Sequence, residues 1–592
     1  MRRAHASDMK IHTEKSEDHQ TPPFYFFRRS NLLWVSLCGF LIFFGTAPAA
    51  DWPMWGGKPE RNMASETEKE LPDSYSIGVE TDNDTVNLAA TKNIKWVAKV
   101  GSKTFGSPVV SQGKVFLGTV GTPSTNATIV CFDEKTGGEL GRFICSRPQG
   151  RGENWGVCST PMIEDNRLYF VTPYVEAVCV DLNSWLQSPT ATSGAGSDKH
   201  VMWRYDMAEK LQSVVDHAAS CSVLVHGDFV YVCTGNGRFK NKKQPFTPLA
   251  PSYVVFNKRT GQLVARDDEQ LGEQTWRGQW SSPSLALVNG KPQILFAGGD
   301  SICYAFEPVD PAAQVAPDRW VTTTLRGPIV SFIDVENKDT GGLTPAEYAK
   351  KFNPLVEQKP ALPLEFRFAN RIPQITLVDI VPTAKVPDVP LLKKIWWFDC
   401  MPPEYRNAPF YSHQCKGDGK PHPCDIVSTP VFYRNRVYVA IGGDPNHGLQ
   451  NSRGNLVCID PTKTGDITQS GKVWSYDKLN ATLTTMAITD GLVFVIAENS
   501  VVHCLDADTG QNYWTYELKS DRGLLSSALV VADGKVFVGK SILAASRTLK
   551  VLGTVESKTT TSSSTPCVAN GTLYIVHGKW LWAVSDKGGK KP

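Results

Sequence analysis

Residues 428–440 read STPVFYRNRVYVA, and residues 456–460 read LVCID. This stretch has a Ser/Thr-rich start, a short apolar strand, a tight turn, a second apolar strand and a third that ends in Asp460. The same order recurs along the chain. Comparable starts lie at Ser107, Ser159, Ser220, Ser282, Ser428, Thr484, Ser526 and Ser564. The sequence therefore predicts eight repeat units.

Tight turns separate the first two strands of several units, namely Gln112-Gly113, Asp490-Gly491, Asp533-Gly534 and Asn570-Gly571. Two-residue β-hairpins prefer Asp-Gly and Asn-Gly because both central residues need a positive φ. A fourth strand often begins near a tryptophan, as at Trp203, Trp396, Trp474 and Trp514. Because a four-stranded unit cannot bury its apolar face alone, radial stacking predicts an all-β fold, an eight-bladed β-propeller.

The last unit, residues 564–585, ends after three strands, whereas a spare strand at 94–100 (IKWVAKV) precedes the first unit. We predict that this N-terminal strand completes the final blade and closes the ring, which removes the open sheet edge. The propeller would then span residues 92–585, between an N-terminal extension at 50–91 and a C-terminal tail at 586–592. Residues 308–393 are predicted to be an irregular, proline-rich insertion in blade four.

The first 49 residues are typical of a signal peptide or N-terminal anchor. Arg28-Arg29 precede the apolar stretch Leu32–Phe44, and Ala47-Pro48-Ala49 follow it as a cleavage site. The apolar stretch is shorter than the about 20 residues of a spanning helix, which favours cleavage. We therefore expect an exported protein, periplasmic or at the cell surface, anchored in the membrane only if this segment is not cleaved.

The charge balance argues against a nucleic-acid partner. The chain carries 62 Lys+Arg and 59 Asp+Glu, a formal net charge of +3, and its basic runs are short. Nucleic-acid binding requires a concentrated basic face.

The repeat unit ends in Asp-x-x-Thr-Gly. This motif is complete with a following tryptophan at 506–514 (DADTGQNYW) and partial at 133–137 and 257–261. It resembles the repeat of the quinoprotein, or PQQ-binding-like, propellers, which PQQ-dependent alcohol dehydrogenases share with BamB-like non-catalytic scaffolds. The segments WPMWGG (52–57), RNM (61–63), GQWSSP (278–283) and DPNHG (444–448) are similar to exported bacterial PQQ-like repeat proteins. The resemblance implies the fold, whereas a fold does not carry its activity with it.

For a quinoprotein dehydrogenase, the resemblance implies PQQ stacked on tryptophan, Ca²⁺ held by carboxylate and amide oxygens, and an aspartate as general base. The chain has no adjacent Cys-Cys pair and no Cys-x-x-Cys-His haem motif. It also has no Gly-x-Ser-x-Gly, His-Glu-x-x-His or phosphate-loop motif. We therefore predict no catalytic residue and expect no cofactor, with PQQ and Ca²⁺ kept as an alternative.

One face of a propeller carries the links between blades and the connections between second and third strands; we call it the funnel face. Polar and aromatic residues predicted there are Arg151, Glu153, Asn154, Trp155, His217, Asn236, Trp276, Arg277, Trp280, Asp300, Asp444, His447 and Arg522. Such residues around a concavity suit a polar, anionic or sugar-like ligand. The alternative is that the tryptophans pack between blades and that Asp444 and His447 cap a turn.

The 14 cysteines fall into different classes. Cys131, Cys179, Cys458 and Cys504 each stand two residues before the Asp that ends a third strand, where other units have Val or Ala. These four are predicted to be small buried hydrophobes, too far apart to form disulfides.

A second cysteine class lies within 12 residues that also hold two histidines: His413, Cys415, His422 and Cys424. A Cys415–Cys424 disulfide is the first interpretation in an oxidising compartment, and a metal site is the alternative. Cys400 is a third candidate for pairing.

The sequence thus favours an exported, non-catalytic propeller that binds a protein or a cell-surface polymer through its funnel face and insertion. A first alternative is a PQQ- and Ca²⁺-dependent oxidoreductase without haem, and a second is a carbohydrate-binding or lyase-like propeller. The scaffold predicts a broad exposed apolar or aromatic patch on one face. The oxidoreductase predicts that Glu153, Asn154, Asp300 or Asp444 converge beneath a tryptophan.

Overall fold

The computed structural model describes residues 50–78, 80, 85–121, 126–148, 155–188, 194–215, 218–237, 247, 249–275, 278–312, 319–324, 356–358, 364–366, 375–377, 380–402, 425–442, 453–518, 529–556 and 564–586. The chain divides into two compact units, Met1–Ala47 and Pro48–Pro592. The first unit, with the predicted signal segment, lies outside the described residues. No helix among the described residues is long and apolar enough to span a membrane.

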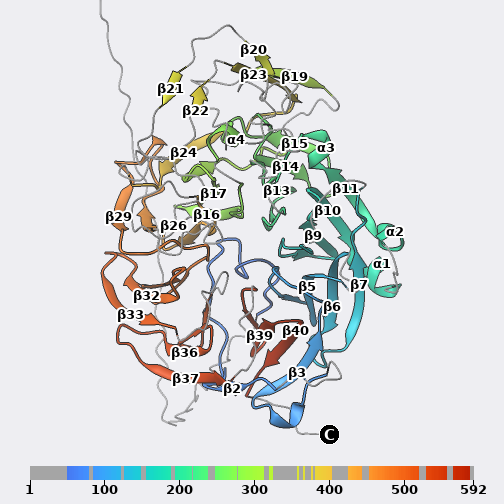
Figure 1. Ribbon diagram of the computed structural model, residues 1–592, viewed down its shortest axis with the longest axis vertical. Coiled ribbons are helices and arrows are strands. Elements are labelled where there is room, and N and C mark those ends of the chain that lie inside the picture. Colours follow the sequence, from blue (N-terminus) through green and yellow to red (C-terminus); the bar gives the residue numbers. More distant parts are fainter. Residues whose placement is uncertain are drawn as a thin grey trace, which may run out of the picture. The chain divides into compact units, whose positions relative to one another are not determined.

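The second unit is an all-β propeller in which seven blades are built from strands that follow one another along the chain (Figure 1). Blade one comprises β4 (Val109–Ser111), β5 (Lys114–Val120), β6 (Ala127–Asp133) and β7 (Glu139–Ile144). Blade two comprises β8 (Met162–Glu164), β9 (Arg167–Val171), β10 (Glu176–Asp181) and β11 (Val201–Asp206). Blade three comprises β12 (Leu224–His226), β13 (Phe229–Cys233), β14 (Tyr253–Asn257) and β15 (Leu263–Arg266).

Blade four comprises β16 (Ser284–Val288), β17 (Lys291–Ala297), β18 (Ile302–Phe306) and β24 (Lys394–Asp399), with β28 (Gly465–Asp466) parallel to β24. Blade five comprises β25 (Val431–Tyr433), β26 (Arg436–Ile441), β27 (Asn455–Ile459) and β29 (Lys472–Tyr476). Blade six comprises β30 (Ala487–Thr489), β31 (Leu492–Ile496), β32 (Val501–Asp506) and β33 (Asn512–Glu517). Blade seven comprises β34 (Val530–Ala532), β35 (Lys535–Val538), β36 (Ser541–Ala544) and β37 (Val551–Glu556), flanked by β1 (Ala64–Ser65) and β2 (Tyr75–Ser76).

A further four-stranded sheet, which we call the terminal sheet, combines the two ends of the propeller sequence. It comprises β3 (Ile94–Lys99), β40 (Trp580–Val584), β39 (Thr572–His577) and β38 (Cys567–Ala569), with β3 antiparallel to β40. The predicted count of eight blades is corrected to seven, because the last repeat unit supplies three strands only and shares its sheet with a strand from the other end of the sequence. The short helices are η1 (Leu88–Ala90), α1 (Leu182–Gln187), α2 (Gly194–Asp198), α3 (Met207–Lys210) and α4 (Leu271–Gln274).

The core consists of layers between neighbouring sheets, since each buried cluster takes side chains from adjacent sheets. Separate clusters join blades one and two, two and three, three and four, four and five, and five and six. The largest cluster joins blade six, blade seven, the terminal sheet and blade one. Burial of apolar surface between sheets is thus continuous from one blade to the next.

The repeat signature has a defined role at the turn between third and fourth strands. Asp506 Oδ1 accepts the Thr509 N–H and hydroxyl, both at 3.0 Å, and Gly510 adopts φ +72°. Trp474 of the preceding blade donates its Nε1–H to Ala507 O at 2.9 Å. A Cβ added to Gly510 would lie 2.6 Å from the Trp474 ring. The motif therefore docks the fourth strand of one blade onto the next.

The predicted hairpin turns are confirmed. Their eight residues all have positive φ: Gln112 54°, Gly113 72°, Asp490 50°, Gly491 75°, Asp533 54°, Gly534 67°, Asn570 52° and Gly571 71°. Positive φ at both central positions is the geometry of a type I′ turn, which matches the twist of the flanking strands.

The predicted cysteine slot is also confirmed, because Cys131, Cys179, Cys458 and Cys504 are buried free thiols. Cys400 is likewise buried and free. Residues 403–424, with the predicted disulfide or metal residues, lie outside the described part of the chain.

The insertion in blade four carries strands where the sequence predicts irregular structure. One sheet has the order β19 (Trp320–Thr324), β23 (Ile380–Pro387) and β20 (Val356–Gln358), and a hairpin pairs β21 (Leu364–Phe366) with β22 (Ile375–Leu377). Figure 1 shows β19, β20 and β23 together beyond blade four. Prolines within a segment argue against a strand, but Pro382 and Pro387 lie within β23 itself.

Candidate binding face

Ser and Thr side chains at the starts of the inner strands connect neighbouring blades. The pairs are Ser107 N to Thr160 Oγ1 (3.1 Å), Thr160 N to Ser222 Oγ (3.0 Å), Ser222 N to Ser282 Oγ (2.9 Å) and Thr429 N to Thr485 Oγ1 (3.0 Å). The Ser564 hydroxyl of the last repeat donates to Gly106 O of the first at 2.8 Å. The Ser/Thr-rich start of each unit thus satisfies backbone groups that face the axis.

The opposite end of the axis is occupied by residues 51–71, which we call the strap. Figure 1 shows its blue trace passing between the inner strands. Its backbone bonds to inner strands are Trp52 N to Val110 O (2.9 Å), Val110 N to Trp52 O (2.8 Å), Ile163 N to Pro53 O (2.9 Å), Leu285 N to Pro59 O (2.9 Å), Phe432 N to Glu60 O (3.2 Å), Met63 N to Met486 O (3.3 Å) and Val531 N to Met63 O (2.9 Å). These bonds cover edges that would otherwise be open.

The strap lies on the side of the turns between first and second strands. Asp51 Oδ2 accepts the Gln112 N–H of the β4–β5 turn at 2.8 Å. Leu71 N donates to Asp533 Oδ2 in the β34–β35 turn at 3.0 Å. Because these turns and the funnel-face connections are at opposite strand ends, the strap lies at the end of the strands away from the funnel face.

Arg61 is the buried charge at the centre of the strap, with 0% exposure. Its guanidinium donates to Pro283 O at 2.9 Å, Trp55 O at 2.7 Å and Val223 O at 2.6 Å. Burial lowers the pKa of Arg61 to about 9, although the nearby Glu60 carboxylate offsets part of this effect. A pKa of about 9 keeps the guanidinium protonated at neutral pH. One side chain thus ties the strap to blades three and four.

Two glycines let the strap fold this tightly. Gly56 and Gly57 have φ of +74° and +71°. A Cβ on Gly57 would lie 2.7 Å from the Trp52 ring, and one on Gly56 would lie 2.6 Å from Arg61 Cα. The WPMWGG segment is therefore a packing motif.

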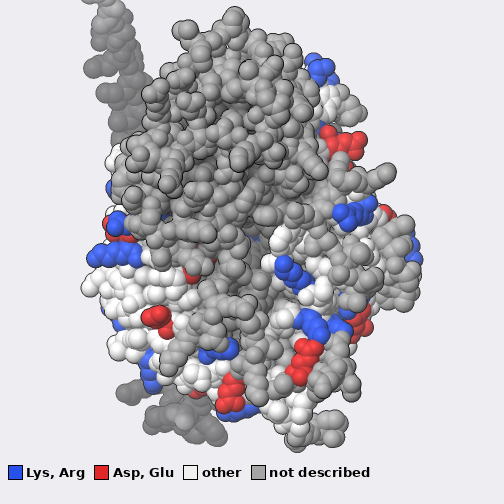
Figure 2. Space-filling view, in the orientation of Figure 1, with Lys and Arg blue, Asp and Glu red and all other residues white. Residues whose placement is uncertain are grey.

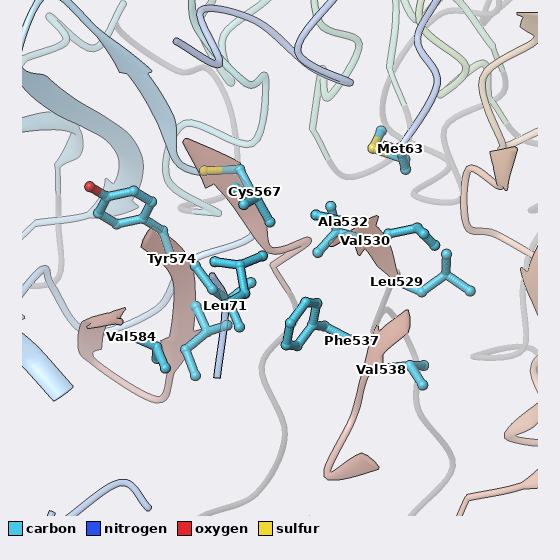
Figure 3. Close-up of a cluster of buried hydrophobic side chains, with 14 of the residues drawn as sticks. Met63, Leu71, Leu529, Val530, Ala532, Phe537, Val538, Cys567, Tyr574 and Val584 are labelled. Atoms are coloured by element: carbon cyan, nitrogen blue, oxygen red, sulfur yellow. The ribbon is translucent and has the colours of Figure 1, made fainter. Parts of the chain in front are cut away.

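Hydrophobic strap residues extend the core of the last sheets. Figure 3 shows Leu71 between the side chains of blade seven and of the terminal sheet, with Met63 nearby. Both are 1% exposed. The strap is thus part of the propeller core.

On the funnel face, Trp155 lies in the link between β7 and β8. Its ring centroid is 5.5 Å from that of Phe105, and Lys103 Nζ lies 4.3 Å from the Trp155 ring and 4.6 Å from the Phe105 ring. A cation over an aromatic face is attracted by the ring quadrupole. These side chains therefore bring the segment between β3 and β4 into contact with the link between β7 and β8. Burial raises the pKa of the nearby Cys158 thiol to about 12, which disfavours nucleophilic chemistry.

The side-chain amide of Asn236 forms hydrogen bonds that stabilise the loop around it. Its Oδ1 accepts the Val214 N–H at 3.1 Å, and its Nδ2 donates to Thr247 O at 3.1 Å and Ala250 O at 3.3 Å. A fully bonded amide has little capacity left for a ligand.

Gln279 stands beside Asn236 at the link to blade four. Its Nε2 donates to Asn236 O at 2.8 Å and to Ser252 Oγ at 2.6 Å. Its Oε1 is buried without a partner among the described residues, so this oxygen keeps acceptor capacity. Trp280 is half-buried, and a Cβ on Gly278 would lie 3.0 Å from its ring.

Asp267 is a buried carboxylate that sequence reasoning missed. It accepts the N–H groups of Ser252 and Tyr253 at 2.8 Å and that of Glu269 at 3.0 Å. Burial raises the pKa of Asp267 to about 6, against the lowering effect of these N–H groups. Carboxyl groups with a shifted pKa also occur in active sites, but Asp267 caps backbone N–H groups. No sequence motif surrounds Asp267, so sequence reasoning could not find it.

Asp300 is committed to the turn between β17 and β18. Its Oδ1 accepts the Ile302 N–H at 3.1 Å, and its Oδ2 accepts the Tyr304 hydroxyl at 2.6 Å. A Cβ on Gly298 would lie 2.3 Å from Oδ1, so the carboxylate folds back over its own turn.

The described residues do not fit a quinone and calcium site. Asp300 is the one predicted carboxylate that the structure describes, and its oxygens are used by the turn. Most predicted funnel residues lie outside the described part: Arg151, Glu153, Asn154, His217, Trp276, Arg277, Asp444, His447 and Arg522. No cluster of three metal-ligating side chains exists among the described residues.

The predicted broad apolar patch is not found among the described residues. Exposed large hydrophobics lie on separate elements: Leu88, Met202, Leu287, Trp320, Leu391, Val473, Leu549 and Val551. Acidic and basic side chains are interspersed on the described surface in Figure 2.

The sheets and the Trp–Gly docking define a β-propeller. Comparison with known proteins shows which of its segments have relatives. Residues 423–516 and 452–591 match the family model described as outer membrane protein assembly factor BamB. Residues 423–591 are therefore similar to the repeats of PQQ-like β-propellers.

Two curated relatives match shorter segments. The 1-butanol dehydrogenase (cytochrome c) of Thauera butanivorans is 31% identical over 127 residues, 20% of this chain and 17% of that protein. The quinohemoprotein alcohol dehydrogenase of Comamonas testosteroni is 28% identical over 105 residues, 16% of this chain and 15% of that protein. The chain thus spans about a sixth of the length of these relatives. Among solved structures, BamB from Moraxella catarrhalis is similar, with 10% identity, a TM-score of 0.46, and coverage of 83% of this chain and 99% of that one.

Proposed function

We propose that this chain is an exported, non-catalytic β-propeller that binds a partner protein through its funnel face and its blade-four insertion. The observation that carries the proposal is the contrast between two sets of residues. On the funnel face, Asn236 and Asp300 use their polar groups internally, whereas the insertion presents β19 at the edge of its described strands on a fixed base.

The terminal sheet joins the two ends of the propeller in this proposal, and β3 closes the ring. Trp96 of β3 donates Nε1–H to Glu134 O of blade one at 2.9 Å. A Cβ on Gly137 would lie 2.6 Å from the Trp96 ring, as it would for Gly261 against Trp203. β3 therefore contacts blade one as the fourth strand of a preceding blade does.

Among the described strands of the insertion, β19 is an edge strand, because the sheet order is β19–β23–β20. Asp388 N donates to Arg319 O at 2.8 Å, which makes this a hydrogen-bonded pair. Such pairs alternate in an antiparallel ladder, so the backbone groups of Trp320 and Thr322 face away from β23. An edge of this kind can pair with a strand of another protein. The Trp320 side chain is 45% exposed beside it.

The base of the insertion is held by blade three. Arg266 Nε donates to Pro387 O at 3.0 Å, and Leu392 N donates to Arg266 O at 2.8 Å. Gln270 Nε2 donates to Thr324 O at the end of β19, at 3.1 Å. The edge strand is thus presented in a fixed orientation, which lowers the entropic cost of binding.

The family match supports the proposal, since its description names a protein of outer-membrane protein assembly. Export is supported by the apolar stretch Leu32–Phe44 and the segment Ala47-Pro48-Ala49. The segmental likeness to two alcohol dehydrogenases favours a second candidate, a PQQ- and Ca²⁺-dependent oxidoreductase without haem.

Photocross-linking tests the proposed surface. A benzophenone side chain in place of Trp320, in cells that make the protein, is expected to give one defined protein adduct that Thr322→Pro abolishes. Proline removes the outward N–H that a partner strand needs. The control is the same side chain at Val473, which is 40% exposed on the outer strand of blade five.

Adducts of equal yield at positions 320 and 473, or an adduct that persists in Thr322→Pro, would contradict the proposal. An adduct to polysaccharide would replace the partner protein by a surface polymer.

A further inference from the structure

Glu68 of the strap is a buried carboxylate, 1% exposed. Its Oε1 accepts the backbone N–H of Ala50 at 3.0 Å and of Asn570 at 3.1 Å, and its Oε2 accepts that of Gly571 at 2.5 Å. Among the described residues, no lysine, arginine or histidine forms an ion pair with it. Neutral amide donors leave a net negative charge in the interior, which is costly.

The peptide nitrogen on Glu68 belongs to the residue that follows the predicted cleavage site. Ala47-Pro48-Ala49 follow the apolar stretch and directly precede Ala50. The boundary between the two compact units, Ala47/Pro48, falls two residues before the Ala49–Ala50 bond. The position is therefore suited to cleavage by a signal peptidase.

We propose that hydrolysis of the Ala49–Ala50 bond makes Ala50 the first residue of the mature protein, and that its new α-ammonium group forms a partly buried ion pair with Glu68. Water adds across the peptide bond: the Ala49 carbonyl carbon takes the water oxygen and becomes a carboxylate, and both water protons go to the Ala50 nitrogen, which becomes an ammonium group. A free α-amino group has a pKa of about 7.7–8.0, so it is cationic at neutral pH. This inference rests on the proposed export, because export supplies the peptidase.

The new terminus lies at the junction of the first and last sheets. Asp51, the next residue, accepts the Gln112 N–H of blade one and, through Oδ1, the Asn570 Nδ2–H of the terminal sheet at 3.2 Å. Glu134 Oε1 also accepts from Asn570 Nδ2, at 3.0 Å. The carboxylates of Asp51, Glu68 and Glu134 all favour a cation here. Processing would thus add a charge-assisted contact at the seam of the ring.

The first test is the mature N-terminus of the exported full chain, read by intact mass and N-terminal sequencing. We expect Ala50. A mature chain that starts elsewhere, or is never cleaved, overturns the inference, while adducts at Trp320 test the scaffold separately.

The second test measures acylation of the α-amino group at pH 7 in the processed protein. The ion pair raises the pKa of the amine, and each unit lowers the neutral, reactive fraction about tenfold. We expect labelling at least about tenfold slower in the native protein and in the control Glu66→Gln, whose side chain is exposed, than in Glu68→Gln. Equal rates in all three proteins would overturn the ion pair.

A third test uses an insertion and therefore does not depend on the Glu68 variant. One alanine inserted between Ala49 and Ala50 displaces the ammonium group by a residue after cleavage. We expect its melting temperature to fall by about 2–4 °C relative to the native protein. An unchanged melting temperature would show that the ammonium group has no specific partner.

Discussion

Replacing Arg61 by methionine is expected to lower the free energy of unfolding by about 3–5 kcal/mol, because each buried acceptor left without its donor costs about 1–3 kcal/mol. The variant keeps an apolar side chain of similar length but removes every donor. The three carbonyls of Trp55, Val223 and Pro283 would then be left buried without partners. Urea-induced unfolding, followed by tryptophan fluorescence, measures this loss.

The matched control is Arg259→Met. The Arg259 side chain is 70% exposed and lies 4.0 Å from Asp228 Oδ1. Surface substitutions of this kind change stability by about 0.5 kcal/mol or less. If Arg61→Met is as stable as Arg259→Met, the strap is not anchored as described.

Replacing Trp96 by alanine is expected to cost about 3–5 kcal/mol, as for other buried tryptophans. Trp96 is 7% exposed, and its ring centroid lies 5.8 Å from that of Tyr574 and 6.5 Å from that of Phe132. Its Nε1–H donates a hydrogen bond to Glu134 O. Its loss opens the seam between the terminal sheet and blade one. The matched control, Trp320→Ala, removes a 45% exposed ring outside the propeller core.

Hydrogen exchange locates the effect of Trp96→Ala. Faster exchange is expected in β3 and in β38–β40, with blades three to five protected as in the native protein. Uniform acceleration, or unchanged exchange in β3, would contradict closure by this strand.

Much of the fold was predictable because its signals are local. The Asp506 cap, the Gly510 φ and the type I′ turns each depend on residues within a few positions. The cysteine slot followed from comparing equivalent positions, such as Cys131 and Val255. The spare strand at 94–100 was recognised because the last unit lacks a fourth strand.

The strap was not predictable, because its partners are distant in sequence. Arg61 bonds Pro283, 222 positions away, and Asn62 bonds Ile488, 426 positions away. No periodic pattern marks such contacts, although the RNM motif was noticed. Asp300 shows the opposite case: its sequence position predicts a carboxylate on the funnel face, but its Oδ2 accepts the Tyr304 hydroxyl beside its own turn.

The central claim, a PQQ-like propeller that acts as a binding scaffold, is tested most directly by adding PQQ and Ca²⁺ to the purified full chain. We expect no quinone absorbance to remain after gel filtration and no change in melting temperature. A ligand at about 100 times its Kd would stabilise the fold by about 2.7 kcal/mol. Stoichiometric quinone with a corresponding rise in melting temperature would contradict the scaffold and support the oxidoreductase.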